Sequence, residues 1–313
     1  MLADEPNTLI LEGGNVFFHP APIPGQDTTA LLPDRSIIAE EYLHKLNVVC
    51  AIGSGDVTFG LSPLKTLLRK HPFTALSANL TDGKATLLFS PSTTLQLQGS
   101  TIGILALTDH TLIRPRQNLS VIPWDRVLDQ EINKLRTQVD FIVLLSNYPF
   151  EENRRIAQRF TDIRLILQSG HRTTNRAPQQ VHNALICQTE KRGTYLGALK
   201  LSLAGNGFWE KRQTKEYRQL ERQLNQVARS LARLQNYAPL SEEDQRTKDR
   251  LETTQDRLKK QKAAFLREGY RGQGEGDLYM YKFLPLHKSL PVEPEVTLHI
   301  KEAIAKREQL RKQ

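Results

Sequence analysis

The stretch Phe-Ile-Val-Leu-Leu-Ser at residues 141–146 contains no charge, no glycine and no proline. A continuous apolar run of this length is typical of a strand that is covered on both faces, as strands of a parallel sheet are. Similar short runs alternate with helix-like periodicity on both sides of it. We expect strands at 8–11, 47–52, 73–80, 86–97, 101–107, 165–167, 184–188 and 196–203, and helices at 36–46, 61–70, 127–137 and 151–160. This alternation predicts an α/β domain with stacked sheets and outer helices.

The last third of the chain has a different pattern, because apolar residues there recur at alternating intervals of three and four. They are Tyr217, Leu220, Leu224, Val227, Leu231 and Leu234, which form the a/d seam of a helix. A second helix is expected from Ser241, whose hydroxyl is placed to cap the amide three residues on, and its seam is Leu251, Leu258 and Phe265. The short connection predicts an antiparallel hairpin. A seam shared with another subunit or a partner protein is the alternative.

These patterns predict three parts of the chain. Residues 1–206 form the α/β domain, and residues 207–268 form an inserted helical hairpin of coiled-coil type. Residues 269–313 supply a return strand at 278–284 and a terminal helix from about residue 295, which we expect to pack on the α/β domain.

The positive charge is concentrated in the helical part. The net charge is +9, from 43 Lys and Arg against 34 Asp and Glu, and residues 210–268 alone hold 15 basic and 10 acidic residues. Mixed charges on helices are usually a solvated face, so no nucleic-acid partner is expected. The alternative is a basic surface for an acidic protein partner, and Arg229 and Arg233 are its candidate contacts.

Several classes of protein are excluded by composition. Two cysteines, Cys50 and Cys187, cannot make a disulfide framework, and no Cys/His cluster has zinc-finger spacing. No apolar run is long enough for a transmembrane helix, and no signal peptide is visible at the start of the sequence. The triplet Thr108-Asp109-His110 is expected to have a solvent-exposed or a capping role at a strand end.

Seven blocks, in order between residues 8 and 203, resemble the 5'-nucleotidase type of calcineurin-like metallophosphoesterase. They are Leu-Ile-Leu-Glu-Gly-Gly-Asn (9–15), Ala-Ile-Gly-Ser-Gly-Asp-Val-Thr-Phe-Gly (51–60), Leu-Ser-Ala-Asn-Leu (76–80), Ile-Gly-Ile-Leu-Ala-Leu-Thr (102–108), Asp-Phe-Ile-Val-Leu-Leu-Ser-Asn (140–147), Leu-Gln-Ser-Gly-His-Arg (167–172) and Gln-Thr-Glu-Lys-Arg-Gly-Thr-Tyr-Leu-Gly (188–197). The resemblance implies a layered α/β/β/α sandwich. It also implies hydrolysis of phosphate esters by two divalent ions such as Mn, Zn, Co or Ca.

The resemblance also places the family's ligands on this sequence, and most of them are replaced. The positions that hold metal ligands in the family are Asn15, Ser54, Asn147, His171 and Thr173 here, and of these only His171 keeps the family residue. The family's Asp-x-His strand has no counterpart in this sequence. Gly55 stands at the position of the catalytic His, and Thr58 stands at the position of the Asp that orients it. Asp56, in the same loop, is the one candidate for a substitute carboxylate ligand.

Two hypotheses about function follow. In the first, the chain has lost two-metal hydrolysis, needs no cofactor and acts as a binding or scaffold module, in keeping with relatives of the cell envelope. In the second, it is an active metal-dependent phosphoesterase acting on nucleotides, represented by a truncated chain. Truncation would imply a periplasmic or secreted protein, and a native start would imply a cytoplasmic one.

Overall fold

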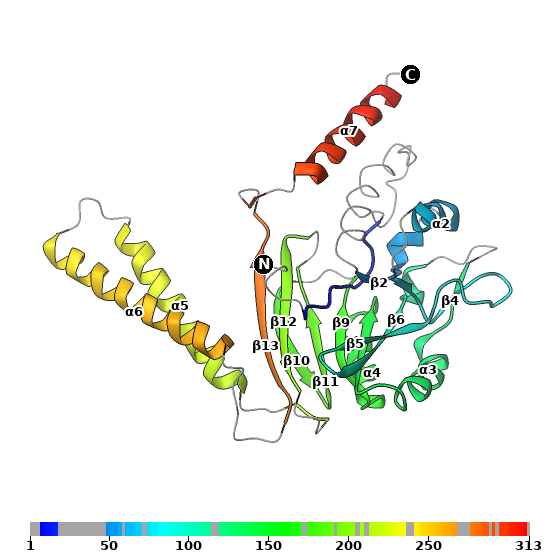
Figure 1. Cartoon of the computed structure of the whole chain (residues 1–313), viewed down its shortest axis with the longest axis horizontal. Helices are drawn as coiled ribbons and strands as arrows, with labels where there is room; N and C mark the ends of the chain where they lie inside the picture. The colour runs from blue at the N-terminus through cyan, green and yellow to red at the C-terminus, as the bar shows by residue number, and fades with distance from the viewer. Residues whose placement is uncertain are drawn as a thin grey trace. The chain divides into compact units, whose positions relative to one another are not determined.

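The computed structural model describes residues 7–17, 48–57, 60–70, 74–113, 119–170, 174–190, 193–203, 207–209, 213–235, 241–267, 276–287, 290–291 and 294–311. Its contacts divide the chain into two compact units (Figure 1). The first contains Met1–Gly197 and Phe283–Gln313, and the second contains Ala198–Lys282. The expected boundaries at residues 206 and 268 stay a prediction.

The first unit is built on a six-stranded sheet with the order β10-β11-β9-β8-β6-β5. Its strands are β5 (Ser92–Leu97), β6 (Ser100–Leu107), β8 (Phe141–Ser146), β9 (Ile163–Gln168), β10 (Arg176–Val181) and β11 (Ala184–Gln188). The four inner strands are parallel, and the edge strands β5 and β10 pair antiparallel to their neighbours. Every residue of β8 is buried, as its unbroken apolar sequence predicts.

A second sheet of three parallel strands has the order β1-β2-β3. Its strands are β1 (Leu11–Glu12), β2 (Val49–Ala51) and β3 (Thr74–Leu76). The two sheets are connected where Ala78 donates its amide to Ala106 of β6, at 2.8 Å. A small antiparallel ribbon pairs β4 (Leu80–Thr81) with β7 (Ser120–Val121).

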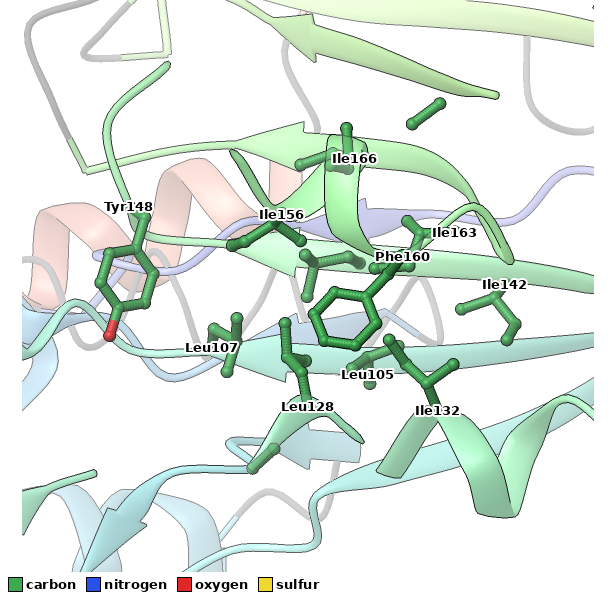
Figure 2. Packing of buried hydrophobic residues seen from close by; sticks show 14 of the residues in the cluster. Leu105, Leu107, Leu128, Ile132, Ile142, Tyr148, Ile156, Phe160, Ile163 and Ile166 are labelled. Atoms are coloured by element: carbon green, nitrogen blue, oxygen red, sulfur yellow. The ribbon is translucent and has the colours of Figure 1, made fainter. Parts of the chain in front are cut away.

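Some of the helices of the first unit bury two apolar clusters against its sheets. The helices of this unit are η2 (Ser54–Val57), α2 (Leu61–Lys70), η3 (His110–Leu112), η4 (Trp124–Arg126), α3 (Leu128–Leu135), α4 (Phe150–Arg159) and α7 (Pro294–Arg311). Figure 2 shows the larger cluster, in which Leu128 and Ile132 of α3 and Ile156 of α4 lie on Leu105 and Ile166 of the six-stranded sheet. The smaller cluster packs Leu64 of α2 with Cys50 of β2 and with Ile52, which follows β2. The layers are those expected of the α/β/β/α sandwich.

The second unit contains the helical hairpin. Its helices are α5 (Gln213–Gln235) and α6 (Glu242–Arg267), which pack on each other. Its strands β12 (Tyr195–Ser202) and β13 (Leu278–Pro285) form a two-stranded sheet. Ser241 caps α6 as expected, because its Oγ accepts the amide of Asp244 at 3.1 Å. No helix in the described part of the chain has the length and apolar character needed to cross a membrane.

The predicted strand at 73–80 is wrong as a single element, because it is interrupted between β3 and β4. The side chain of Asn79 binds the backbone of Thr108. Its Nδ2 donates to the carbonyl and its Oδ1 accepts the amide, both at 2.8 Å. The Asn79 side chain thus makes two hydrogen bonds with Thr108 of the kind that a paired strand would make with its backbone, and the strand is interrupted between β3 and β4.

The strand β10 was not predicted from the sequence. Its residues Arg-Ala-Pro-Gln-Gln-Val include a proline and no apolar alternation. An edge strand tolerates both features, because one side of it needs no hydrogen-bond partner and one face is solvated. The predicted helix at 36–46 lies outside the described residues.

Candidate functional site

The carboxyl ends of four parallel strands meet in one place, which is where α/β folds form their sites. Asn15 follows β1, Ser54 follows β2, Asn147 follows β8, and Ser169 follows β9. Hydrogen bonds join residues of all four segments. We call the residues Gly13, Asn15, Gly53, Ser54, Gly55, Asp56, Asn147, Ser169 and Gly170 the strand-end cluster.

The carboxylate of Asp56 is enclosed by backbone amides. Its Oδ2 accepts the amides of Asn15 at 2.7 Å and Gly53 at 2.9 Å, and its Oδ1 accepts the amide of Phe17 at 2.9 Å. The residue is fully buried. Hydrogen bonds to an ionised acceptor are stronger than neutral ones. Asp56 therefore ties the loop after β1 to the loop after β2.

The amide side chains of Asn15 and Asn147 are also used as acceptors. Asn15 Oδ1 accepts the amide of Gly55 at 2.6 Å. Asn147 Oδ1 accepts both the amide and the hydroxyl of Ser54, each at 3.0 Å. A carbonyl oxygen has two lone pairs, so both lone pairs of Asn147 Oδ1 are occupied. Asn147 Nδ2 donates to Ser169 Oγ at 3.2 Å, and that hydroxyl donates to the carbonyl of Gly13.

Glycines let these side chains approach the backbone. A Cβ at Gly170 would lie 2.1 Å from Asn147 Nδ2, and a Cβ at Gly53 would lie 2.5 Å from Asn15 Oδ1. Gly170 also has a φ of +83°, which favours glycine. The space at the strand ends is thus filled by the asparagine side chains themselves.

A second carboxyl group lies beside the strand-end cluster. Burial, and after it the charge of Asp56, raise the pKa of Glu12 to about 7, although hydrogen bonds from the amides of Gly13 and Gly14 act to lower it. Glu12 is the last residue of β1 and pairs in register with Cys50. Burial, together with the charges of Glu12 and Asp56, raises the pKa of the Cys50 thiol. Cys50 is therefore a protonated core residue.

The described residues do not fit a pair of divalent ions. Within the described segments, no group of three His, Cys, Asp or Glu side chains could hold a metal ion. The oxygens of Asn15, Asn147 and Asp56 already accept amide hydrogens, so a metal would have to displace these bonds. Two ions also need carboxylates to balance their charge.

Several of the residues predicted from the sequence come together here, and others lie elsewhere. Asn15, Ser54, Gly55, Asp56 and Asn147 all belong to the cluster. The positions 58, 171 and 173, where Thr58, His171 and Thr173 stand, lie outside the described residues. The partner candidates Arg229 and Arg233 are exposed on α5.

Sequence reasoning missed Ser169 and Glu12. The signal for Ser169 was its position between a predicted strand and Gly170, which resembles the position of Ser54 between a predicted strand and Gly55. Glu12 carried no signal, because its raised pKa depends on burial and on Asp56, which is 44 residues away in the sequence.

The Thr108-Asp109-His110 triplet has the capping role, which is one of the two roles expected for it. Asp109 Oδ1 accepts the amide of Thr111 at 2.8 Å at the start of η3. His110 Nδ1 lies 2.9 Å from Tyr148 Oη, and burial raises the pKa of that phenol. Cys187 is partly buried, and burial raises its pKa to about 12, so its thiol is unreactive at neutral pH.

No protein-family model and no curated protein matches the chain. Solved structures do match it. A 5'-nucleotidase precursor from Thermus thermophilus is 21% identical over 66% of this chain and 44% of its own, with a TM-score of 0.56. The sulfate thiohydrolase SoxB of Thermus thermophilus is 16% identical over 96% of this chain and 43% of its own, with a TM-score of 0.63.

A third match is the calcineurin-like phosphoesterase YfkN from Bacillus subtilis, which is 12% identical over 99% of this chain and 87% of its own, with a TM-score of 0.60. The chain spans less than half the length of the 5'-nucleotidase precursor and of SoxB. The expected fold is confirmed: the chain has the fold of the 5'-nucleotidase-type, calcineurin-like metallophosphoesterases.

Proposed function

We propose that this chain is a non-hydrolytic form of the metallophosphoesterase fold that acts as a binding or scaffold module. The observation that carries the proposal is the hydrogen bonding at the strand ends. The side-chain oxygens of Asn15, Asn147 and Asp56 accept backbone amides of the same cluster. These are the oxygens that two-metal catalysis would need as ligands.

The chemistry of the loop after β2 supports the same proposal. Hydrolysis of a phosphate ester by this mechanism needs a group that gives a proton to the leaving oxygen. Gly55 stands where the family has its histidine and has no side chain. The neighbouring Ser54 donates both its amide and its hydroxyl to Asn147. Neither residue is therefore placed to move a proton onto a substrate.

The strand-end cluster has a structural use in this proposal. Asp56 binds amides from two loops, and Asn147 links the loop after β2 to the end of β9. In the two-metal enzymes the loops at this edge converge on the ions. Here a buried carboxylate and two amide side chains hold the loops, so the fold keeps its rigid edge without metal.

The test is an assay of phosphate release from 5'-nucleotides and from a chromogenic phosphate ester, with Mn²⁺, Zn²⁺, Co²⁺ or Ca²⁺ added. A 5'-nucleotidase of the same fold serves as the positive control. We expect no release above the rate of the buffer, and no saturable rise in melting temperature with any of the four ions. Turnover of about 1 per second, as is common for enzymes, would contradict the proposal and support the active phosphoesterase instead.

A matched pair of variants shows whether any phosphate release comes from the strand-end cluster. Asn147→Ala removes the acceptor of Ser54, whereas Asn225→Ala changes an exposed amide on α5. Release that is lost in the first variant and kept in the second would place a working centre at the strand ends. Release that both variants keep would come from a contaminating phosphatase.

A further inference from the structure

The hairpin uses its apolar residues within the chain. The seam positions of α5 that the structure describes are all partly buried: they are Leu220, Leu224, Val227, Leu231 and Leu234. On α6, Leu258 is only 5% exposed. Lys262 near the end of α6 binds Glu221 near the start of α5, at 2.8 Å, which fixes the helices as antiparallel. In the described part of the hairpin, the outer faces of the two helices therefore remain available for a contact with another molecule.

The outer face of α5 is a row of arginines. Arg222 and Arg229 are one heptad apart and lie opposite the seam, and Arg233 follows one turn later. All three are exposed. None of them forms an ion pair with any other described residue. The remaining exposed outer positions carry no charge: they are Gln219, Asn225, Gln226 and Ala232. We call Arg222, Arg229 and Arg233 the arginine row.

The outer face of α6 differs, because it carries both signs of charge. Ion pairs within this helix join Arg246 to Glu242, Lys248 to Glu252, and Lys259 to Asp256 at 3.8–3.9 Å. Between residues 219 and 235 of α5, by contrast, the only acidic residue is Glu221, which pairs with Lys262. Between residues 219 and 235, the arginine row therefore has no ion-pair partner on its own helix.

We propose that the arginine row docks an acidic α-helix of a partner protein. Three guanidinium groups extend over about 16 Å along α5. A helix with carboxylates at intervals of seven and four residues presents them on one face at the same spacing. Arginine is suited to this contact, because its planar group binds a carboxylate through two parallel hydrogen bonds. This inference rests on the proposed function, in which the molecule works through contacts.

Two other kinds of partner fit the row less well. A helix that lies in a membrane surface needs an apolar face to insert, and the apolar residues of α5 lie in the seam. Tight binding to nucleic acid takes about six to ten phosphate contacts, or aromatic side chains for stacking. The row supplies three cations, and residues 219–235 contain no aromatic residue.

The experiment uses the full chain and two labelled, alanine-rich helical peptides of the same composition. In one peptide the glutamates are spaced four, seven and four residues apart, which matches the row in either direction. In the other peptide they are spread around the helix. At low salt, anisotropy should show about tenfold tighter binding of the first peptide, and about 300 mM salt should weaken it.

Two triple variants with the same change in charge complete the test. R222Q/R229Q/R233Q should lose about tenfold in affinity for the spaced peptide. The control R246Q/R250Q/R257Q changes exposed arginines of α6 and should change the affinity by less than about twofold. Circular dichroism must show unchanged helix content in both. Equal binding of the two peptides, or an equal loss in both variants, would overturn the proposal.

Further measurements test whether DNA, a membrane or a second copy of the chain, and not an acidic helix, binds the arginine row. Duplex DNA or phosphatidylglycerol vesicles that bind more tightly than the spaced peptide, and only when the three arginines are present, would replace the acidic helix as partner. Sedimentation that shows a dimer lost in R222Q/R229Q/R233Q would make a second copy the occupant and also overturn the proposal. Phosphate release, measured on the same preparations, would contradict the proposed function whatever the peptides do.

Discussion

The strand-end cluster and the arginine row differ in whether their charged groups have partners within the fold. Asp56 is buried, and three backbone amides bind its carboxylate. The three arginines of the arginine row are exposed, and none of them forms an ion pair with another described residue. The two regions therefore differ in what they offer to another molecule.

This difference shows which part of the molecule is available for binding. A buried polar group must be satisfied within the fold, because leaving it unpaired costs free energy. Once satisfied, it has little left to give a ligand. Exposed arginines keep their hydrogen-bonding capacity, since water replaces a partner at little cost. In the proposed function, the polar groups at the strand ends are thus used within the fold, and the arginine row remains available for contact with another molecule.

The largest expected effect comes from removing the charge in the strand-end cluster. Asp56→Asn replaces a carboxylate oxygen by an amino group that cannot accept the facing amides. The free energy of unfolding should fall by about 3 kcal/mol, measured by urea denaturation. Asp249→Asn on the exposed surface of α6 is the control and should change it by less than about 0.5 kcal/mol. Similar values for both variants would show that Asp56 does not hold the loops together.

Close packing at the strand ends should give the next largest effect. Gly170 and Gly99 have φ values of +83° and +81°, but only Gly170 has atoms within 4 Å of an added Cβ. Gly99→Ala should cost about 1 kcal/mol from backbone strain alone. Gly170→Ala should cost about 2 kcal/mol in all, because Asn147 has to move as well. Equal losses in thermal denaturation would mean that the asparagine side chain is not packed against Gly170.

The raised pKa of Glu12 should make stability depend on pH. The folded pKa of about 7 lies above the ordinary value of 4.5, so the folded state binds the proton more tightly. The contribution of Glu12 to the free energy of unfolding is therefore complete below pH 4.5. It falls as the pH rises toward 7 and does not change further above pH 7. The loss should be about 2 kcal/mol. Glu12→Gln should abolish this part of the pH dependence in urea titrations, and a slope that persists unchanged would assign it to other groups.

The smallest expected effect belongs to the ion pair of the hairpin. Lys262 and Glu221 are 2.8 Å apart and partly exposed. A double-mutant cycle with Lys262→Met and Glu221→Gln should give a coupling of about 0.5 kcal/mol that declines with salt. A coupling above about 2 kcal/mol would mean that this pair, and not the apolar seam, holds the two helices together.

Most regular elements could be predicted from local patterns. The apolar run of β8, the helix at 61–70 and the seam of α5 each have a period or an unbroken apolar stretch that belongs to one kind of element. The break between β3 and β4 could not be predicted in this way. It depends on a side chain, Asn79, that bonds to a residue 29 positions later.

The candidate site was predictable in its location but not in its chemistry. The order of the sequence blocks placed Asn15, Ser54 and Asn147 at strand ends that meet, and the structure brings them together. Asp56 was considered only as a substitute metal ligand. Its actual partners are amides, two of them in a loop about 40 residues earlier in the sequence. A hydrogen bond between distant segments leaves no local pattern.

The amino-acid sequence alone was enough to predict the alternation of strands and helices and the antiparallel hairpin, and it has amide or glycine residues, not carboxylates or imidazoles, at Asn15, Gly55 and Asn147. These follow from residue type and spacing, which are local. Contacts between distant segments were needed to show that backbone amides bind Asp56, that burial and the charge of Asp56 raise the pKa of Glu12, and that the arginine row forms no ion pair with another described residue. Each of these depends on which segments, distant in the chain, are brought close enough to exchange hydrogen bonds or charge.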